Sequence, residues 1–285
     1  MILRSDSSLD DRKRSGKTLL AKRIVLERLK STIDCVVPIG KANEEYWKYY
    51  FGEKFPMSPM PYAVDNSFFQ GNAGEASPHR ETLRRELGLE PGRPVILYAS
   101  KLQSRKCCID LVEAYTWLAP APGVDPAAYL LIIGDGEERA AVEARAQASG
   151  LSSIRFLGFR NQTELPRFFD LCDIFVLPSI HEPRGLIVNE VMNAGRAVVV
   201  TDQVGCQPDL VQNALRVTMG ENGLRLIGHQ SFEEDVPGLR RASPARFQRF
   251  RRNRGNACPD PPGLSLRNGR RVSGDDQLGS FLTPC

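Results

Sequence analysis

The segment HEPRGLIVNEVMNAGRAVVV, residues 181–200, contains a candidate phosphate-binding site. Pro183 favours the first turn of a helix, because the N–H that proline lacks would have no partner there. A helix beginning at this proline would present the free backbone amides of Arg184, Gly185 and Leu186. Such a terminus attracts phosphate, and the glycine lets a ligand approach the backbone closely.

Two carboxylates flank this candidate site. Glu182 lies just before the expected helix, and Glu190 lies two turns along it, so the pair would bracket an elongated ligand with phosphate at its centre. The alternative is that acids near a helix start merely stabilise the helix dipole. Glu190, however, is surrounded by apolar neighbours in the helix, and a buried carboxylate without a partner is costly. That cost favours a ligand role.

Strand and helix patterns alternate through the middle of the chain and predict an α/β fold with a doubly wound, Rossmann-like parallel sheet. In such sheets ligands bind at the carboxyl ends of the strands. The expected strands are 34–40, 94–100, 129–135, 154–159, 173–178 and 197–202, and the expected helices are near 106–118, 137–149, 163–171 and 184–194.

Two segments upstream of this pattern have a different character. Residues 12–33 predict a basic helix in which Leu19, Leu20, Ile24, Leu26 and Leu29 could form one apolar face. Its charged side would be a solvated face or, alternatively, a membrane-surface contact. Residues 55–78 are rich in Pro, Gly, Ser and Asn, which is typical of a linker.

The charge of the chain is concentrated at its carboxyl end. Ten Arg against three Asp give residues 236–285 a net charge of +7, which leaves −3 for the first 235 residues of a chain whose net charge is +4. The segment 229–285 lacks periodicity and is rich in Arg, Pro and Gly, so we expect disorder. Such a tail attracts nucleic acid nonspecifically, but no element that would read bases is evident, so we expect no specific nucleic-acid partner.

The bulk composition, 41% hydrophobic and 25% charged, is that of a globular protein. No apolar run is long enough for a spanning helix or a signal core, so we expect a cytoplasmic location. The seven cysteines are irregularly spaced, without a CxxC pair or accompanying histidines, which indicates reduced thiols and no metal site.

The pattern EPRGLIVNE, with Glu182 and Glu190, resembles the EPxGLxxxE signature of retaining glycosyltransferases of the GT-B type, specifically glycosyltransferase family 4, whose domain is called glycosyl transferases group 1. The resemblance extends over most of residues 34–224. Four further segments follow in the family's order: VILYASKLQSRKCCIDLVEAY, IIGDGEER, FLGFRNQTELPRFFDLCDIFVLPS and AGRAVVVTDQVGCQPDLV.

This resemblance implies a role for each candidate residue. Glu182 would lie beside the donor sugar, and Glu190 would accept hydrogen bonds from the ribose hydroxyls of the nucleotide. Arg184, Gly185 and Leu186 would offer backbone amides to the diphosphate. The catalytic set would be Glu182 with two cations that neutralise the leaving diphosphate without a metal, Lys101 and Lys106. Alone, each lysine would be interpreted as a surface charge.

Several positions depart from the family pattern. Ser100 and Lys101 replace the usual Gly and Arg, and Cys107 replaces the usual Gly. Lysine keeps the charge but loses the planar fork of arginine, so the grip on phosphate is expected to be weaker. Gly134 and Gly136 also resemble a phosphate loop, but without a GxGxxG pattern we interpret them as a turn between a strand and a helix.

The resemblance implies the carboxy-terminal, donor-binding half of a GT-B fold. We expect residues 1–65 to be a remnant of the amino-terminal acceptor domain, 66–92 a linker and first helix, 93–228 the nucleotide-sugar-binding domain and 229–285 the tail. Family-like sequence stops after ENGLRL at 221–226. The hypothesis is therefore that the chain is a truncated copy of such an enzyme, with or without a shift of the reading frame.

The expected activity is that of a retaining hexosyltransferase. It would use a UDP- or GDP-linked donor and a glycan or lipid-linked acceptor in polysaccharide or glycolipid synthesis, with peripheral contact at the inner membrane face. No cofactor or metal is expected. The alternatives are an inactive nucleotide-sugar-binding module, because half a cleft positions an acceptor poorly, and a nucleotide-sugar epimerase, which fits the EPRGLIVNE pattern less well.

Overall fold

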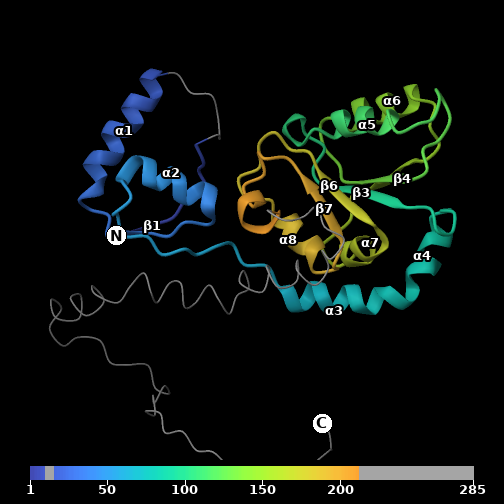
Figure 1. Ribbon diagram of the computed structural model, residues 1–285, viewed down its shortest axis with the longest axis horizontal. Helices are drawn as coiled ribbons and strands as arrows, with labels where there is room; N and C mark the ends of the chain where they lie inside the picture. Colours follow the sequence, from blue (N-terminus) through green and yellow to red (C-terminus); the bar gives the residue numbers. More distant parts are fainter. Residues whose placement is uncertain (10–15, 212–285) are drawn as a thin grey trace, which may run out of the picture. The chain divides into compact units, whose positions relative to one another are not determined.

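The structure is a computed structural model that describes residues 1–9 and 16–211. Its main element is a five-stranded parallel sheet with the strand order β5-β4-β3-β6-β7 (Figure 1). The strands are β3 (Val95–Ala99), β4 (Tyr129–Ile133), β5 (Ile154–Gly158), β6 (Ile174–Leu177) and β7 (Ala197–Val200). Each of these strands lies within a predicted one, so the predicted doubly wound α/β fold is confirmed.

The central strand β3 pairs with β4 on one side and with β6 on the other. Because β4 follows β3 in the chain whereas β6 does not, the direction of winding reverses between β3 and β6. In open parallel sheets such a reversal opens a crevice at the carboxyl ends of the strands, and ligands bind there.

Alternate residues of the strands enter two different cores, as the period of two in a strand requires. Leu97 and Leu131 belong to one buried cluster, and Tyr98 and Leu130 belong to the other. Both faces of the sheet are therefore buried, which explains why the predicted strands are continuous apolar runs rather than alternating ones.

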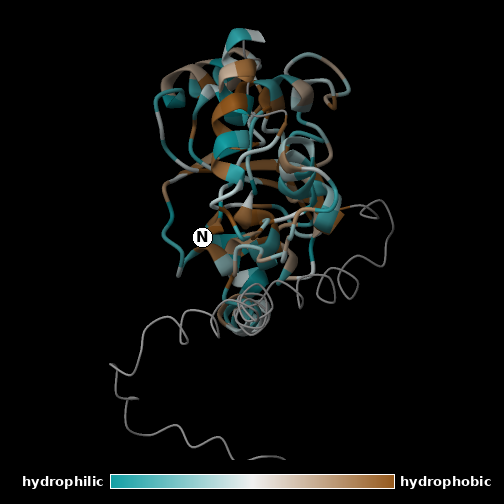
Figure 2. Ribbon diagram, turned by 90° about the vertical axis from the view of Figure 1, so that its left-hand side faces the viewer, coloured by the Kyte–Doolittle hydropathy of each residue, from teal (hydrophilic) through white to brown (hydrophobic). Residues whose placement is uncertain are grey.

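Helices cover both faces. In Figure 1, α5 and α6 lie on one face of the sheet, and α7 and α8 lie on the other. The helices of this domain are α5 (Cys108–Thr116), α6 (Arg139–Ala148), α7 (Leu165–Leu171) and α8 (Leu186–Met192), with the short helices η2 (Ser104–Lys106) and η3 (Gln207–Val211). The helices in Figure 2 change between hydrophilic and hydrophobic residues along their length, as expected when one face is buried.

The prediction of a linker over residues 55–78 is wrong beyond residue 65. Residues 66–76 form α3 (Asn66–Ala76), which is followed by η1 (Ser77–His79) and α4 (Arg80–Glu86). The carboxylate of Asp65 accepts a hydrogen bond from the Phe68 amide at 2.9 Å and caps α3. Phe69 is buried, and its ring lies 6.2 Å from that of Phe169 on α7. Tertiary packing thus stabilises a helix in a segment whose Gly- and Asn-rich composition predicts a linker.

The amino-terminal segment has a two-stranded sheet of its own. It contains β1 (Ile2–Leu3), α1 (Gly16–Lys30), β2 (Cys35–Val36) and α2 (Lys41–Phe51), and its own aromatic core. Of the strand expected at 34–40, only β2 forms, and it pairs with β1 rather than with the main sheet.

Helix α1 does not bury one apolar face, contrary to the prediction. No residue of α1 is fully buried. Of the five predicted apolar residues, only Leu26 packs against the aromatic core, and it is partly buried, whereas Leu19, Leu20, Ile24 and Leu29 are exposed. At about 100° per residue the apolar side chains of α1 are distributed around the helix axis rather than along one stripe. None of the helices in the described segments is both long enough and apolar enough to cross a membrane.

The expectations for residues 212–228 and for the Arg-rich tail, 229–285, concern parts of the chain outside the described residues.

Candidate functional site

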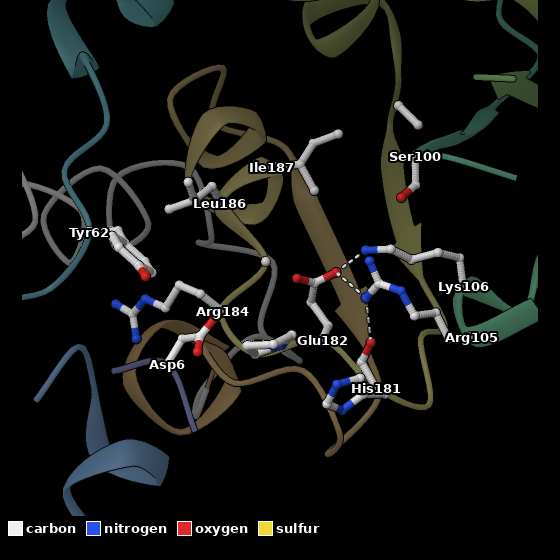
Figure 3. Close-up of a pocket in the computed structure, with 13 residues that line it drawn as sticks. Asp6, Tyr62, Ser100, Arg105, Lys106, His181, Glu182, Arg184, Leu186 and Ile187 are labelled. Atoms are coloured by element: carbon white, nitrogen blue, oxygen red, sulfur yellow. Dashed lines mark hydrogen bonds and ion pairs between the residues drawn. The ribbon is translucent and has the colours of Figure 1, made fainter. Parts of the chain in front are cut away.

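A cavity of about 630 Å³ opens where β3 and β6 end (Figure 3). It therefore occupies the place that the sheet topology predicts for a ligand. The residues lining the cavity come from four segments that are far apart in the sequence. They are Asp6, Tyr62, Ala99, Ser100, Arg105, Lys106, His181, Glu182, Pro183, Arg184, Gly185, Leu186 and Ile187.

Lys106 and Glu182 form an ion pair at this cavity. The Lys106 ammonium donates a hydrogen bond to Glu182 Oε2, and the two side chains are only 9% and 14% exposed. Burial, together with the positive charges of Arg105 and Lys101, lowers the pKa of Lys106 to about 8. The Glu182 carboxylate opposes this lowering and favours the charged amine. Two predicted catalytic residues are thus brought into direct contact.

Arg105 was not among the predicted site residues, although it lines the same cavity. Its Nη1 donates to the His181 carbonyl oxygen at 2.9 Å and lies 3.9 Å from Glu182 Oε2 (Figure 3). The sequence signal that could have identified it is its position next to Lys106, in the turn between a strand and a helix.

The loop before α8 differs in detail from the prediction. The helix begins at Leu186 and not at Pro183, because Gly185 adopts a left-handed conformation with φ 78°. A Cβ at Gly185 would lie 2.9 Å from Val204 Cγ1, so the turn requires glycine. The backbone N–H groups of Gly185 and Leu186 donate to no acceptor within residues 1–9 and 16–211. These two amides are available to a ligand.

A second segment holds this loop in place. Glu182 and Val204 form a parallel bridge, and the Gly205 amide donates to the Glu182 carbonyl at 2.8 Å. The Cys206 amide donates to the Arg184 carbonyl at 2.9 Å. The segment after β7 therefore fixes the backbone that carries Glu182.

The side chain of Arg184 is held in a buried ion pair. It is 5% exposed, and its Nη1 lies 2.5 Å from Asp209 Oδ2 on η3. The prediction assigned the backbone amide of Arg184, not its side chain, to phosphate. The helix begins two residues after Arg184, so this amide is not in the first turn of α8 as predicted.

Glu190 lies in α8, one turn beyond Ile187. Desolvation by burial raises the pKa of its carboxyl group to about 7. Residues three apart lie on the same side of a helix, so Glu190 shares a side of α8 with Ile187, which lines the cavity. Glu190 itself is not among the residues that line the cavity.

A second cavity, of about 460 Å³, lies next to the first. Ala99, Ser100 and Ile187 line both cavities, so the two adjoin. Lys101 lines the second one rather than the first, together with Phe159, which is 71% exposed. The predicted catalytic lysines are therefore placed at two neighbouring cavities.

Gly134 and Gly136 also line the second cavity, in the turn between β4 and α6. A Cβ at Gly134 would collide with the backbone of Ser100, and one at Gly136 with the backbone of Leu102. These glycines allow the chain after β3 to pack closely against the chain after β4, in agreement with their interpretation as a turn.

Comparison with known proteins identifies the family. Residues 79–226, just over half of the chain, match the family model described as Glycosyl transferases group 1. The chain belongs to this family. Among curated proteins, it is 34% identical over 141 residues to the lipopolysaccharide core biosynthesis glycosyltransferase LpsE of Rhizobium meliloti, with 48% of this chain and 39% of that protein covered.

A second curated relative is the 2-deoxystreptamine glucosyltransferase of Streptomyces kanamyceticus. It is 34% identical over 142 residues, which cover 49% of this chain and 35% of that protein. The chain therefore matches less than half of the length of either curated relative.

Solved structures show the same GT-B fold. Anabaena Alr3699/HepE in complex with UDP aligns with a TM-score of 0.63 at 17% identity, over 84% of this chain and 71% of that chain. Sucrose-phosphate synthase from Thermosynechococcus elongatus aligns with a TM-score of 0.59 at 21% identity, over 85% of this chain and 62% of that one.

One departure from the group 1 pattern has a visible structural consequence. Cys107, at the position where the resemblance leads us to expect glycine, has φ 54° and is the one non-glycine residue with positive φ among the described residues. It is also buried. The left-handed conformation costs a side chain about 1–2 kcal/mol, which explains a preference for glycine there.

The remaining cysteines of the described segments, Cys35, Cys108, Cys172 and Cys206, are also free and buried, and burial raises the pKa of each thiol. Within those segments, no three His, Cys, Asp or Glu residues are grouped so that they could hold a metal ion.

Proposed function

We propose that this chain binds a nucleotide sugar at the carboxyl ends of β3 and β6 and transfers the sugar to a hydroxyl acceptor with retention of configuration. The observation that carries the proposal is the cavity that combines a buried Lys106–Glu182 pair with the free amides of Gly185 and Leu186. Cationic and N–H donors around one cavity are what a diphosphate requires.

The diphosphate occupies the boundary between the two cavities. Lys106 approaches it from one cavity and Lys101 from the other, while Gly185 and Leu186 donate backbone N–H groups. Arg184 offers its backbone amide from the loop that precedes α8, and its side chain stays paired with Asp209. Fixed cations stabilise the charge that develops on the leaving diphosphate, so the reaction needs neither a metal nor another cofactor.

Binding of the donor changes the partner of Lys106. In the structure its ammonium is neutralised by Glu182. When the diphosphate arrives, the ammonium turns to phosphate oxygen, and the Glu182 carboxylate becomes available to the donor sugar. One residue pair thereby keeps both charges satisfied before binding and serves two parts of the ligand afterwards.

The nucleoside lies in the second cavity. Its lining is largely apolar and includes Phe159, Leu165 and Ile187, which suits the flat face of a base. Glu190 shares a side of α8 with Ile187 and accepts hydrogen bonds from the ribose hydroxyls. These bonds would favour the ionised carboxylate and so compensate part of its burial cost.

The proposed donor is a UDP- or GDP-linked hexose. Alr3699/HepE has been solved with UDP and with UDP-glucose, which supports a nucleotide-sugar ligand for this fold. The proposed acceptor is a glycan or a lipid-linked glycan at the inner face of a membrane, and the name of one relative, a lipopolysaccharide core biosynthesis glycosyltransferase, supports the glycan part of this proposal.

Titration calorimetry with UDP, GDP and ADP tests the first part of the proposal. An assay with the matching nucleotide sugars, with NMR of the anomeric proton of the product, tests transfer and retention. Nucleotide binding with retained configuration is the expected result. Binding without hydrolysis or transfer would instead favour the inactive nucleotide-sugar-binding module, and no binding of any nucleoside diphosphate would contradict the proposal.

A further inference from the structure

Arg105 joins the turn after β3 to the loop that carries Glu182. Its guanidinium Nη1 donates to the His181 carbonyl at 2.9 Å, and its own carbonyl accepts from the Ile180 amide at 3.0 Å. These two contacts run in opposite directions between the same pair of segments. The position of the guanidinium relative to Glu182 is therefore defined by the backbone on both sides.

Much of the donor capacity of this guanidinium is unused. An arginine side chain has five N–H donors, and the hydrogen bond to the His181 carbonyl involves only Nη1. The contact with Glu182, at 3.9 Å, is an ion pair longer than a hydrogen bond. The side chain is 41% exposed and lines the 630 Å³ cavity. It can therefore meet an anion in that cavity without being extracted from a core.

We propose, on the basis of the function proposed above, that Arg105 binds a phosphate group of the donor diphosphate. It supplies the planar, two-pronged guanidinium at a site where the expected arginine is replaced by Lys101. Lysine provides only a point charge, whereas an arginine fork matches two phosphate oxygens at once. Lys106 and Arg105 then both bind the diphosphate, and the hydrogen bond to the His181 carbonyl fixes the position of the guanidinium relative to Glu182.

The proximity of Arg105 to Lys106 provides a second test, which is the pH dependence of diphosphate binding. Arg105 is one of the charges that lower the pKa of Lys106. Without it the Lys106 amine stays protonated to higher pH, so the alkaline limit of diphosphate binding should move upward. A residue that acted only on folding would not move this limit.

Calorimetry on the full chain tests the inference with three variants. Arg105→Gln removes the charge, Arg105→Lys keeps the charge but not the fork, and Arg155→Gln is the control, since Arg155 is exposed on β5 and lines neither cavity. The ligands are UDP and GDP, each compared with its nucleoside, uridine or guanosine, measured by NMR titration.

The expected result is that Arg105→Gln weakens diphosphate binding by about tenfold to hundredfold and leaves nucleoside binding unchanged. Arg105→Lys should fall between wild type and Arg105→Gln, and Arg155→Gln should match wild type. In Arg105→Gln the alkaline limit of UDP binding should also rise.

Equal diphosphate affinity in wild type and Arg105→Gln would overturn the inference, as would an equal loss for diphosphate and nucleoside. If Arg105→Gln does not fold, the inference is tested with Arg105→Lys, whose affinities for the diphosphate and for the nucleoside are compared with those of wild type in the same way. A wild-type chain that binds neither UDP nor GDP would instead refute the proposed function, so the two failures are distinguishable.

Discussion

The Lys106 ammonium lies in hydrogen-bond contact with the Glu182 carboxylate, although 76 residues separate them in the chain. Both side chains are largely buried, with exposed fractions of 9% and 14%. Removing either partner leaves the other charge in a poorly solvated place, which costs more than the pair itself contributes. Each charge is therefore compensated by the other, and both lie beside a cavity that suits a charged ligand.

The pair should show strong coupling in a double-mutant cycle. Lys106→Met and Glu182→Gln each preserve the approximate shape of the side chain, and each should lower the free energy of unfolding by about 1–3 kcal/mol. The double variant should be less destabilised than the two single effects added together, by about 0.5–3 kcal/mol. Urea denaturation of the four proteins measures the coupling, and strictly additive effects would show that the ion pair is not formed in solution.

The two glutamates should separate nucleotide binding from sugar chemistry. Glu190→Ala should weaken UDP or GDP binding by about tenfold to hundredfold, because a charge-assisted hydrogen bond to the ribose is lost. Glu182→Ala should keep nucleotide affinity close to wild type and reduce sugar transfer. Titration calorimetry measures the first effect and a transfer assay the second. Unchanged nucleotide affinity in Glu190→Ala would rule out the ribose contact.

Glu190 should make the stability of the free protein depend on pH. Its folded pKa, about 7, lies above the ordinary value of 4.5, so the folded state holds the proton more tightly than the unfolded state. Stability should therefore fall as pH rises from about 4.5 to 7. Glu190→Gln removes this loss of stability. The free energy of unfolding of the variant, relative to that of wild type, should therefore rise by about 1–3 kcal/mol from pH 5 to pH 8.

Denaturation midpoints at pH 5, 6, 7 and 8 measure this effect. Glu137→Gln, at an exposed position of the same domain, is the control for the general pH dependence. A constant difference between Glu190→Gln and wild type across this range would show that the Glu190 carboxyl is not desolvated.

The variant Cys107→Gly should be more stable than the variant Cys107→Ala. Both Cys107→Ala and Cys107→Gly remove the buried sulfur, but only glycine relieves the left-handed backbone at φ 54°. After subtraction of the larger chain entropy of glycine in the unfolded state, the glycine variant should be more stable by about 0.5–1 kcal/mol. Thermal denaturation compares the two, and a more stable alanine variant would contradict the assigned backbone conformation.

The sequence predicts the sheet well because the signal is local. Runs such as 95–99 and 129–133 are apolar throughout, and only a strand buried on both faces needs that composition. The pattern fails at 66–76, where helix α3 is stabilised by Phe69 against Phe169, a contact between residues a hundred positions apart. A composition rich in Gly and Asn carries no information about such a contact.

The sequence predicts several residues of the candidate site but not their geometry. The motif points to Glu182, Gly185 and Leu186, which do line one cavity. Sequence alone did not place the start of α8 at Leu186, because the left-handed turn at Gly185 packs against Val204, which is distant in the sequence and leaves no room for a Cβ. Arg105 was missed for a related reason: its partner, the His181 carbonyl, is a backbone atom and has no signature in the sequence.

A crystal structure of the full chain with UDP or GDP, whichever binds more tightly, tests the central claim most directly. The account predicts the diphosphate at the junction of the two cavities, with its oxygens in contact with Lys106 and with the amides of Gly185 and Leu186. It also predicts that the ribose faces Glu190. A nucleotide bound elsewhere, with the Lys106–Glu182 pair and both amides untouched, would contradict the account.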